Sequence, residues 1–303
     1  MHPIEILRHI ARSDPGDVVV VAAEAAQALS WMADEPEEML TAVRRLIDFH
    51  PACGPLWWVG ARVLSAPDAS EAAESSLGEL EGDRTGVVLA CALDEFGGTG
   101  ESRERRGGGD LVVVASGAGG SLRTGLGRCR RPCEVRVVGE LRSARRQGRT
   151  LASAAGGVVC FDEDEAPAAL LGAGLLLVEA LAAGYAGVVA AAGARRLAEL
   201  AAAAGVPVWA VGGAGRVLPE PLFQALVARI GQEGERRRSS RPRYGWDASS
   251  WPADLEAGAS NRACYEVVPA GLVSSFVGPG GVSGAWSPPV DCPVPPDLLK
   301  PAR

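Results

Sequence analysis

The chain has 303 residues, of which 47% are hydrophobic and 22% charged, as expected for a globular protein of one or two domains. No apolar run is long enough to span a bilayer, and the N-terminus lacks the basic-then-apolar layout of a secretory signal, so we expect a cytoplasmic protein without a membrane partner. The net charge of −7 and the pI near 5.2 argue against nucleic acid as a partner.

Side chains suited to acid–base chemistry or metal binding are scarce. The three histidines are His2, His9 and His50, all in the first fifty residues, and the one lysine is Lys300. Schiff-base chemistry and the phosphate-binding lysine of a P-loop are thereby excluded. The seven cysteines are scattered and form no zinc-binding set. We therefore expect neither a metal nor a cofactor, and no catalytic residue is assigned.

The first third of the chain is predicted to be helical. Apolar residues recur at helical spacing in four segments, which are residues 18–32, 36–49, 56–64 and 70–80. The segment 97–110 ends in three consecutive glycines, which is typical of a linker. We therefore expect an N-terminal helical domain over residues 1–105.

From residue 110 onward, short apolar runs alternate with Ala-rich stretches. The runs are residues 111–115, 135–138, 157–160, 175–178 and 206–211, and Ala194–Ala204 is a predicted crossover helix. Strands that alternate with helices indicate a parallel, doubly wound sheet. The predicted fold class is thus α/β, with a Rossmann-like domain over residues 106–285. A polar insertion at about 232–259 is expected to be mobile, and residues 286–303 form a Pro-rich tail.

A Gly-rich turn joins the first strand of this domain to a helix. Such a turn presents backbone N–H groups and the positive end of a helix to an anion, although it can also serve only to reverse the chain. Its candidate ligand-binding residues are Ser116, Gly117, Gly119, Gly120 and Ser121. Arg142 follows the next strand and is placed to hold a phosphate, with an ion pair to Glu140 or Glu134 as the alternative.

Nine arginines lie between Arg123 and Arg149. Their charge is either part of an ordinary solvated surface or a positive field that attracts a phosphorylated ligand or an acidic protein partner. Together with the turn, this field predicts a phosphorylated small molecule as the ligand.

Several motifs occur in a specific order along the chain. Residues 138–152 are similar to a Glu-Ser-Arg-Pro…Gly-x-x-Leu-Ala signature, and residues 172–205 to a Gly-Ala-Asp-Leu-Val-Leu-Val-Gly-Ala-Asp…Gly-x-Val-Asn…Gly-Thr stretch. Asn261–Pro269 resembles Asn-Pro…Phe-Asp-Val-Thr-Pro, and His50–Trp57 resembles Arg-Pro…Pro-Leu-Trp. In this order they resemble the initiation factor 2B alpha/beta/delta subunit family, which is related to methylthioribose-1-phosphate and ribose-1,5-bisphosphate isomerases. The resemblance covers roughly residues 43–281 and implies a helical domain, a Rossmann-like domain and a homodimer.

The sequence departs from the isomerases where the resemblance implies catalytic residues. Ser116 lies in the stretch that matches their cysteine, and Ala190-Ala191 match their Asn-Lys pair. An ungapped match places Glu179-Ala180-Leu181 opposite a Gly-Ala-Asp run, so that Leu181 replaces the aspartate. Proton movement in aldose–ketose isomerisation needs groups that these side chains do not supply. A catalytic role for Glu179 as a displaced carboxylate and a strand-end ion pair with an arginine both remain open.

We therefore expect a non-catalytic protein that binds a sugar phosphate or nucleotide phosphate, with a regulatory or protein-interaction role. The alternative is a sugar-phosphate aldose–ketose isomerase with rearranged catalytic residues, in which Glu179 would act on the ligand. A scaffold that keeps only a dimer surface is the third hypothesis. An apolar stretch from Ala166 to Ala204 is the sequence-based candidate for that surface.

Overall fold

The computed structural model describes residues 10, 17–96, 110–155, 157–239, 265–284 and 291–300, and of residues 234–239 it describes the backbone alone. Its first part is a bundle of helices, which are α2 (Val18–Ser30), α3 (Pro36–Phe49), α4 (Gly54–Ser65) and α5 (Ala69–Glu81). Asp17 and Asp68 cap α2 and α5, each accepting a hydrogen bond from a backbone N–H of the first turn. Helix α4 is apolar on nearly all sides and therefore lies at the centre of the bundle, with Trp57 fully buried.

The second part is built on a seven-stranded sheet. Its strands are β1 (Leu111–Ser116), β2 (Cys133–Val138), β3 (Val158–Phe161), β4 (Leu175–Glu179), β7 (Val208–Val211), β9 (Ser275–Gly278) and β10 (Gly281–Ser283). Their order is β10-β9-β7-β4-β1-β2-β3, and all neighbours are parallel except β9 and β10. The predicted apolar runs form the parallel strands because both faces of the sheet are covered: adjacent Val113 and Val114 are both fully buried.

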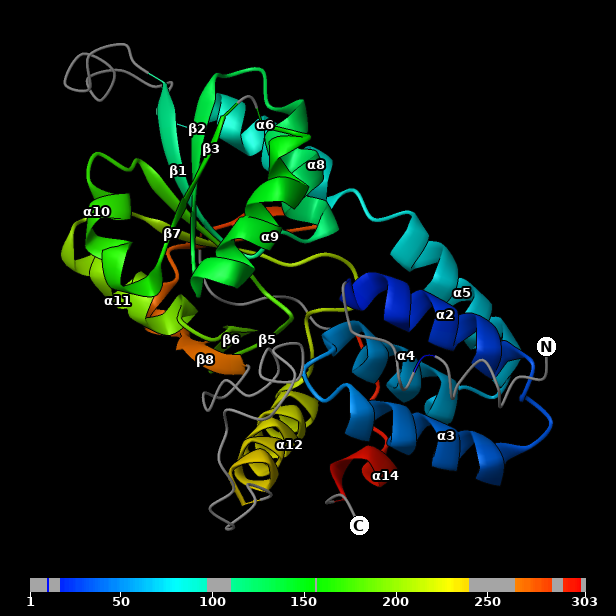
Figure 1. The fold of residues 1–303 in the computed structure, drawn as a ribbon. Coiled ribbons are helices and arrows are strands. Elements are labelled where there is room, and N and C mark those ends of the chain that lie inside the picture. Colours follow the sequence, from blue (N-terminus) through cyan, green and yellow to red (C-terminus); the bar gives the residue numbers. More distant parts are fainter. Residues whose placement is uncertain are drawn as a thin grey trace, which may run out of the picture.

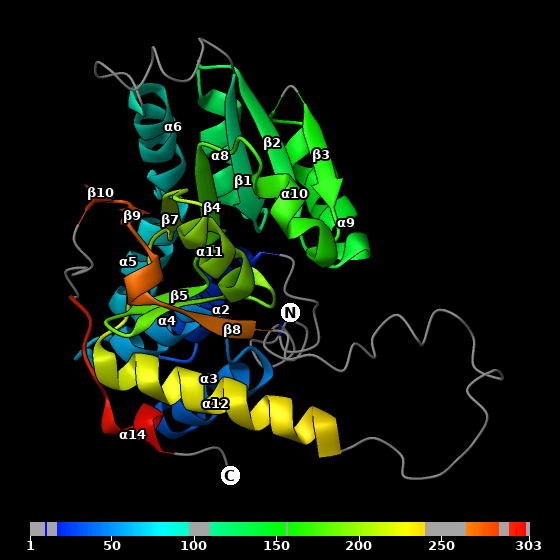
Figure 2. The same ribbon diagram turned by 90° about the vertical axis from the view of Figure 1, so that its left-hand side faces the viewer.

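Helices lie on both faces of this sheet (Figures 1 and 2). One layer consists of α6 (Thr85–Glu95), α8 (Gly120–Arg128) and α9 (Leu141–Ala152), whose apolar residues pack with Leu111, Val113 and other residues of one sheet face. The other layer consists of α10 (Ala166–Leu170) and α11 (Ala194–Ala203), which cover the opposite face around Val114 and Leu176. The result is a three-layer α/β arrangement, as predicted.

A small antiparallel sheet connects the two parts. It contains β5 (Ala182–Gly184), β6 (Gly187–Ala191) and β8 (Tyr265–Pro269), in the order β5-β6-β8. Ala182 and Val189 belong to the core of the helical bundle, whereas Ala183 and Val188 belong to the core beside α11. Because successive side chains of a strand point to opposite faces, this sheet joins both hydrophobic cores. Helix α12 (Glu220–Ser239) packs against the helical bundle (Figure 2).

Three features differ from the sequence-based expectations. Helix α6, which the sequence patterns did not predict, packs on the sheet rather than on the bundle, while the expected boundary at residue 105 lies outside the described residues. Helix α12 runs to Ser239, so the first residues of the expected insertion are helical, and residues 240–259 lie outside the described part. The tail is not wholly extended, because its prolines start the short helix α14 (Pro296–Leu299).

The docking of α14 also differs from a free tail. Leu298 is fully buried, and the Arg44 side chain of α3 donates two hydrogen bonds to the Asp297 carbonyl oxygen, at 3.1 and 2.6 Å. Figure 1 shows α14 beside α3 and α12. Among the residues that the structure describes, no helix is both long enough and apolar enough to cross a membrane.

Candidate functional site

The strand order reverses between β1 and β4, from which the chain proceeds in opposite directions along the sheet. In open α/β sheets, ligands bind outside the carboxyl ends of the strands at such a switch point. The turn Ser116–Ser121 lies at the carboxyl end of β1, and Glu179 is the last residue of the adjacent β4. The sequence-predicted turn and Glu179 therefore meet at this position.

The Glu179 carboxylate occupies the N–H groups of the turn. Its Oε2 accepts hydrogen bonds from the backbone N–H of Ala118 at 3.1 Å and of Gly119 at 2.9 Å. Gly119 is the N-cap of α8, where the helix dipole and free N–H groups favour a negative charge. The chain's own carboxylate thus holds the two N–H groups that a bound anion would use.

Arg216 completes this arrangement from the loop after β7. Its Nη1 donates to Glu179 Oε1 at 3.1 Å and to the Ala180 carbonyl oxygen at 2.6 Å. The side chain of Arg216 is 1% exposed and that of Glu179 is 14% exposed, so the ion pair is largely shielded from water. Arg216 Nε has no hydrogen-bond partner among the described residues. The interpretation of Glu179 as a strand-end residue paired with an arginine is confirmed.

Two of the predicted ligand-binding glycines are in contact with Glu179. Gly117 has φ of +112°, and a Cβ atom there would lie 2.5 Å from Glu179 Cβ. A Cβ on Gly119 would overlap the Glu179 carboxylate itself. These glycines are therefore needed so that the turn can close around the carboxylate.

Further carboxylates surround the turn. Asp83 accepts hydrogen bonds from Thr85 Oγ1 at 2.6 Å and from Ser121 Oγ at 3.4 Å. Asp17 Oδ2 lies where it would be 3.4 Å from a Cβ on Gly120. An anion that approached this turn would meet the carboxylates of Glu179, Asp83 and Asp17. The nearby arginine, Arg216, is already paired with Glu179.

The predicted positive field does not concentrate at the turn. Arg142 is exposed in the first turn of α9, and its side chain makes no hydrogen bond or ion pair with any described residue, including the expected Glu140 and Glu134. Arg136 instead pairs with Glu134, at 2.7 Å. Arg130 and Arg131 lie between α8 and β2, at the amino edge of the sheet, where their backbone N–H groups bind Asp94. The arginines are thus divided between the two edges.

The positions that match isomerase residues take part in the packing and backbone hydrogen bonding of the fold itself. Leu181 directs its carbonyl oxygen to the N–H of Gly54 at 3.1 Å, which links the α/β part to α4. Ala190 is 1% exposed within the small sheet. Within the described ranges, no cluster of histidine, cysteine, aspartate and glutamate side chains has the geometry of a metal site.

The sequence patterns missed Arg216 and Asp83. Arg216 follows the predicted strand at 206–211 and therefore lies at the carboxyl edge, as Arg142 does, and that position was the one available signal. Asp83 precedes α6, which was itself not predicted.

Comparisons with known proteins agree with this fold. No protein-family model and no curated protein sequence matches the chain. The solved structure of translation initiation factor eIF-2B from Pyrococcus horikoshii OT3 has a TM-score of 0.66 at 13% identity, covering 93% of this chain and 96% of that one. The tetrameric eIF2B-beta2-delta2 complex from C. thermophilum gives 0.59 at 15% identity, covering 93% and 90%.

An isomerase shares the same architecture. The 5-methylthioribose 1-phosphate isomerase from Pyrococcus horikoshii OT3 has a TM-score of 0.54 at 16% identity, covering 92% of this chain and 83% of that one. The fold implied by the sequence motifs is therefore confirmed. Over more than nine-tenths of its length, this chain has the fold of the eIF2B subunits and of methylthioribose-1-phosphate isomerase.

Proposed function

We propose that this protein is a non-catalytic, eIF2B-like protein that acts through protein contacts, and that Glu179 replaces a phosphate ligand at the turn after β1. The observation that carries the proposal is the pair of hydrogen bonds from the Ala118 and Gly119 N–H groups to the Glu179 carboxylate. A carboxylate there satisfies the same donors as a phosphate oxygen and repels a second anion.

The sequence match indicates which residue of the isomerase pattern Glu179 replaces. Glu179 stands opposite the first glycine of the Gly-Ala-Asp run, where no side chain would fill the turn. The buried Arg216 then takes the role of a counter-ion for the internal carboxylate. The predicted phosphorylated ligand would therefore have to displace Glu179 from three hydrogen bonds. Among the described residues of the turn and of the first turn of α9, Arg142 is the one cation whose side chain is left to contact that ligand.

Assembly supports a role in protein contacts. A chain with this fold forms the tetrameric eIF2B-beta2-delta2 complex. We propose by analogy that this chain forms a homodimer and carries a regulatory role, with a further protein partner as an extension of the same role.

The alternative isomerase would need Glu179 to move protons on a sugar. Three of the roughly four acceptor positions of its carboxylate are already occupied, by two N–H groups and by Arg216. We expect no turnover of methylthioribose-1-phosphate by the purified protein. Turnover that is lost in Glu179→Ala would establish the isomerase instead.

Anion binding by two variants tests the internal-ligand proposal. Glu179→Gly empties the turn, so inorganic phosphate should raise its melting temperature, whereas phosphate should leave the wild type unchanged. Glu179→Gln is the matched control, because the amide fills the same space and should bind no phosphate. If the wild type binds a sugar phosphate and Arg142→Ala weakens that binding about tenfold or more, the phosphate-sensor hypothesis replaces ours.

A further inference from the structure

Helix α9 carries a stripe of four exposed arginines. Arg142, Arg145, Arg146 and Arg149 stand at positions i, i+3, i+4 and i+7, so they share one face of the helix. Their side chains make no hydrogen bond or ion pair with any residue that the structure describes. Like charges at these spacings repel one another. The stripe is thus a concentration of uncompensated positive charge on a chain whose net charge is −7.

The neighbouring strand, β3, forms one edge of the main sheet. It is last in the strand order and pairs with β2 on one side (Figure 2). The carbonyl oxygens of Gly157 and Phe161 accept hydrogen bonds from backbone N–H groups in and just after β2. Because successive residues of a strand direct their backbone groups to alternate sides, those of Val158 and Cys160 point to the outer side. No described residue bonds to them there, so this edge can accept another strand.

Two arginines of the stripe lie next to this edge. Gly148 faces β3, because a Cβ atom there would lie 2.5 Å from Cys160 Sγ. Around the helix, Arg145 and Arg149 lie to one side of Gly148, where they are exposed, whereas Gln147 on the other side is half-buried. The two arginines are therefore on the side of α9 that faces away from the other helices and along the edge.

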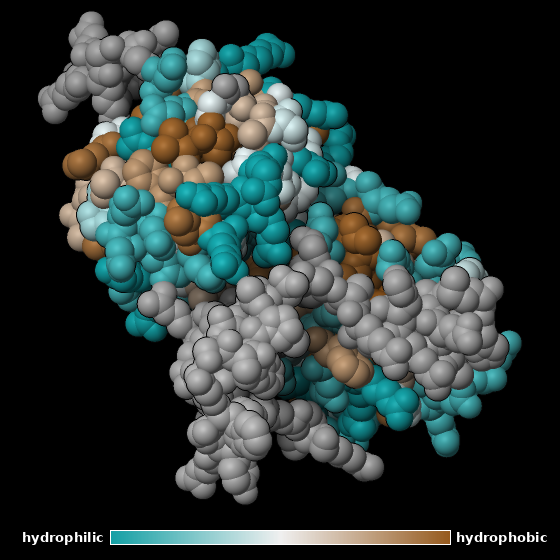
Figure 3. Space-filling view, viewed as in Figure 1, coloured by the Kyte–Doolittle hydropathy of each residue, from teal (hydrophilic) through white to brown (hydrophobic). Residues whose placement is uncertain are grey.

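The opposite face of the edge is apolar. Side chains of a strand alternate between faces, so Val159 points away from α9, and it is 46% exposed. Leu171, which follows α10, is 73% exposed, and its carbonyl oxygen accepts a hydrogen bond at 2.7 Å from Arg136, the β2 residue opposite Val159. Figure 3 shows hydrophobic residues over β2 and β3 next to hydrophilic ones over α9. One face of the edge is thus cationic and the other apolar.

We propose that the β3 edge and the α9 arginines together bind an extended, acidic segment of a protein partner, which adds a strand to the sheet. The added strand bonds to the backbone groups of Val158 and Cys160. Acidic residues at every second position meet Arg145 and Arg149, and the apolar residues between them meet Val159. The spacings agree, because residues i and i+4 of a helix are about 6 Å apart along its axis and residues i and i+2 of a strand about 6.6 Å.

This inference rests on the proposed role in protein contacts and names the surface and the chemistry of the partner. The acidic residues after β3 are engaged elsewhere: Asp162 and Glu165 form a capping box around η1 (Glu163–Glu165), and Asp164 lies 3.7 Å from Arg196 of α11. A nucleic acid is the less suited occupant. Its phosphates would pair with the arginines but leave the backbone groups and the apolar face of the edge without partners.

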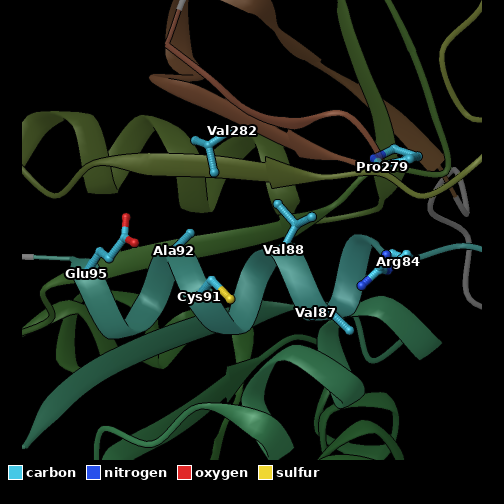
Figure 4. Close-up of a pocket in the computed structure, with 8 residues that line it drawn as sticks. All are labelled: Arg84, Val87, Val88, Cys91, Ala92, Glu95, Pro279 and Val282. Atoms are coloured by element: carbon cyan, nitrogen blue, oxygen red, sulfur yellow. The ribbon is translucent and has the colours of Figure 1, made fainter.

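A groove along α6 is a second candidate surface (Figure 4). It has a volume of about 380 Å³ and lies beside β10, at the other edge of the sheet. Arg84 and Glu95 stand at its two ends, so it carries charges of both signs and selects no partner by charge. The β3 edge, with charge of a single sign, defines its occupant more closely.

Binding of a designed peptide tests the proposal. The probe is a fluorescent octapeptide in which glutamate and valine alternate, and the full-length wild type should bind it with an affinity that falls as salt is added. The double variant Arg145→Gln/Arg149→Gln should weaken binding by about tenfold or more. Arg128→Gln, at the exposed end of α8, is the matched control and should bind as the wild type does. All three proteins should melt at nearly the same temperature, because these arginines are exposed.

Two further measurements locate the peptide. The amide protons of Val158 and Cys160 should exchange more slowly when it is bound, since a strand then covers them. A peptide of the same composition, with its glutamates in one block and its valines in another, cannot place acidic and apolar residues on opposite faces. It should bind about tenfold more weakly or less.

Several results would overturn the proposal. These are a wild type that does not bind the alternating peptide, equal binding by the double variant or of the block peptide, and unchanged exchange at β3. An oligothymidylate that binds more tightly than the peptide, and is weakened by the double variant, would make nucleic acid the occupant. Because Glu179 is unchanged in every variant, none of these results alters the outcome of the phosphate test described above.

Discussion

Two pairs of oppositely charged side chains differ in whether they meet within the chain. Glu179 and Arg216 find each other inside the chain, with backbone donors and an acceptor completing the arrangement. Arg84 and Glu95 lie at the two ends of α6, too far apart to pair, and their side chains make no hydrogen bond or ion pair with any described residue. The difference shows that a buried charge is stabilised by a counter-ion and backbone groups from distant parts of the chain, whereas a charge of the same sign as its own helix end stays in solvent.

The largest effect is expected from breaking the internal pair. Arg216→Met leaves the Glu179 carboxylate without its counter-ion and the Ala180 carbonyl without its donor, and should lower the free energy of unfolding by about 3–5 kcal/mol. Urea denaturation measures this loss. Adding Glu179→Gln should recover a substantial part of it, since the unpaired charge is then removed. A loss of less than about 1 kcal/mol would show that the pair is dispensable.

Thiol reactivity compares the same two regions. Burial raises the pKa of Cys53, which lies near Arg216 and Asp17, from 9.0 to about 12, while Cys91 is exposed on α6. At pH 8 the Cys53 thiolate fraction should thus be roughly a thousandfold below that of an ordinary thiol. Iodoacetamide followed by peptide mass analysis should label Cys91 in the native protein and Cys53 only after denaturation.

The raised pKa also has a consequence for stability. The unfolded Cys53 thiol ionises above pH 9 whereas the folded one stays protonated, so its contribution to folding is present below pH 9 and falls as the pH rises toward 12. Rapid labelling of native Cys53 at pH 8 would contradict both expectations.

A smaller effect separates two adjacent glycines. A methyl group on Gly119 would overlap the Glu179 carboxylate, whereas one on Gly120 would meet only Asp17 Oδ2 at 3.4 Å. Gly119→Ala should therefore cost about 1–3 kcal/mol in the free energy of unfolding. Gly120→Ala, the matched control, should be neutral or stabilising because it lies in the first turn of α8. Equal melting temperatures for the two variants would mean that Glu179 leaves the turn readily.

The smallest effect is expected at Asp94, a half-buried carboxylate that, like Glu179, accepts hydrogen bonds from backbone N–H groups. Its carboxylate accepts hydrogen bonds from the backbone N–H groups of Arg130 at 2.8 Å and Arg131 at 3.1 Å, and from Cys129 Sγ. Burial is the largest single influence and raises the pKa of Asp94, but the hydrogen bonds from Cys129 and from these N–H groups together outweigh it and lower the pKa below 3.8.

Solvent weakens this second carboxylate site. Asp94→Asn should cost less than about 1 kcal/mol at pH 7. Because the folded pKa is depressed, the difference from wild type should be present above pH 3.8 and vanish as the pH falls below it. Thermal melts at pH 7 and pH 3 measure this, and a difference as large as that of Arg216→Met would contradict the role of burial.

The sequence predicted the elements whose pattern is local. The parallel strands were identifiable because burial on both faces leaves continuous apolar runs, as at Leu111–Ser116. Helix α6 was missed because nearly all of its residues are apolar or small, which hides the helical period. The strands of the small sheet are three to five residues long and take their stability from both neighbouring cores.

The candidate site was predicted in part for a similar reason. Glu179 and the turn after β1 could be placed at one edge of the sheet from the strand order alone. Arg216 comes 37 positions after Glu179, in a Gly-rich loop with no pattern of its own, so only the folded chain brings them together. The contact between Arg44 and Asp297, 253 positions apart, is equally invisible in the sequence.

The filled turn also has a genetic consequence. Glutamate and glycine codons can differ by a single base, so one point mutation at residue 179 separates a turn that holds its own carboxylate from one that is vacant. Arg216, Gly117 and Gly119, which contact Glu179, are present in both cases. Under selection for a phosphorylated effector, a single base change at this position would therefore be enough to vacate the turn.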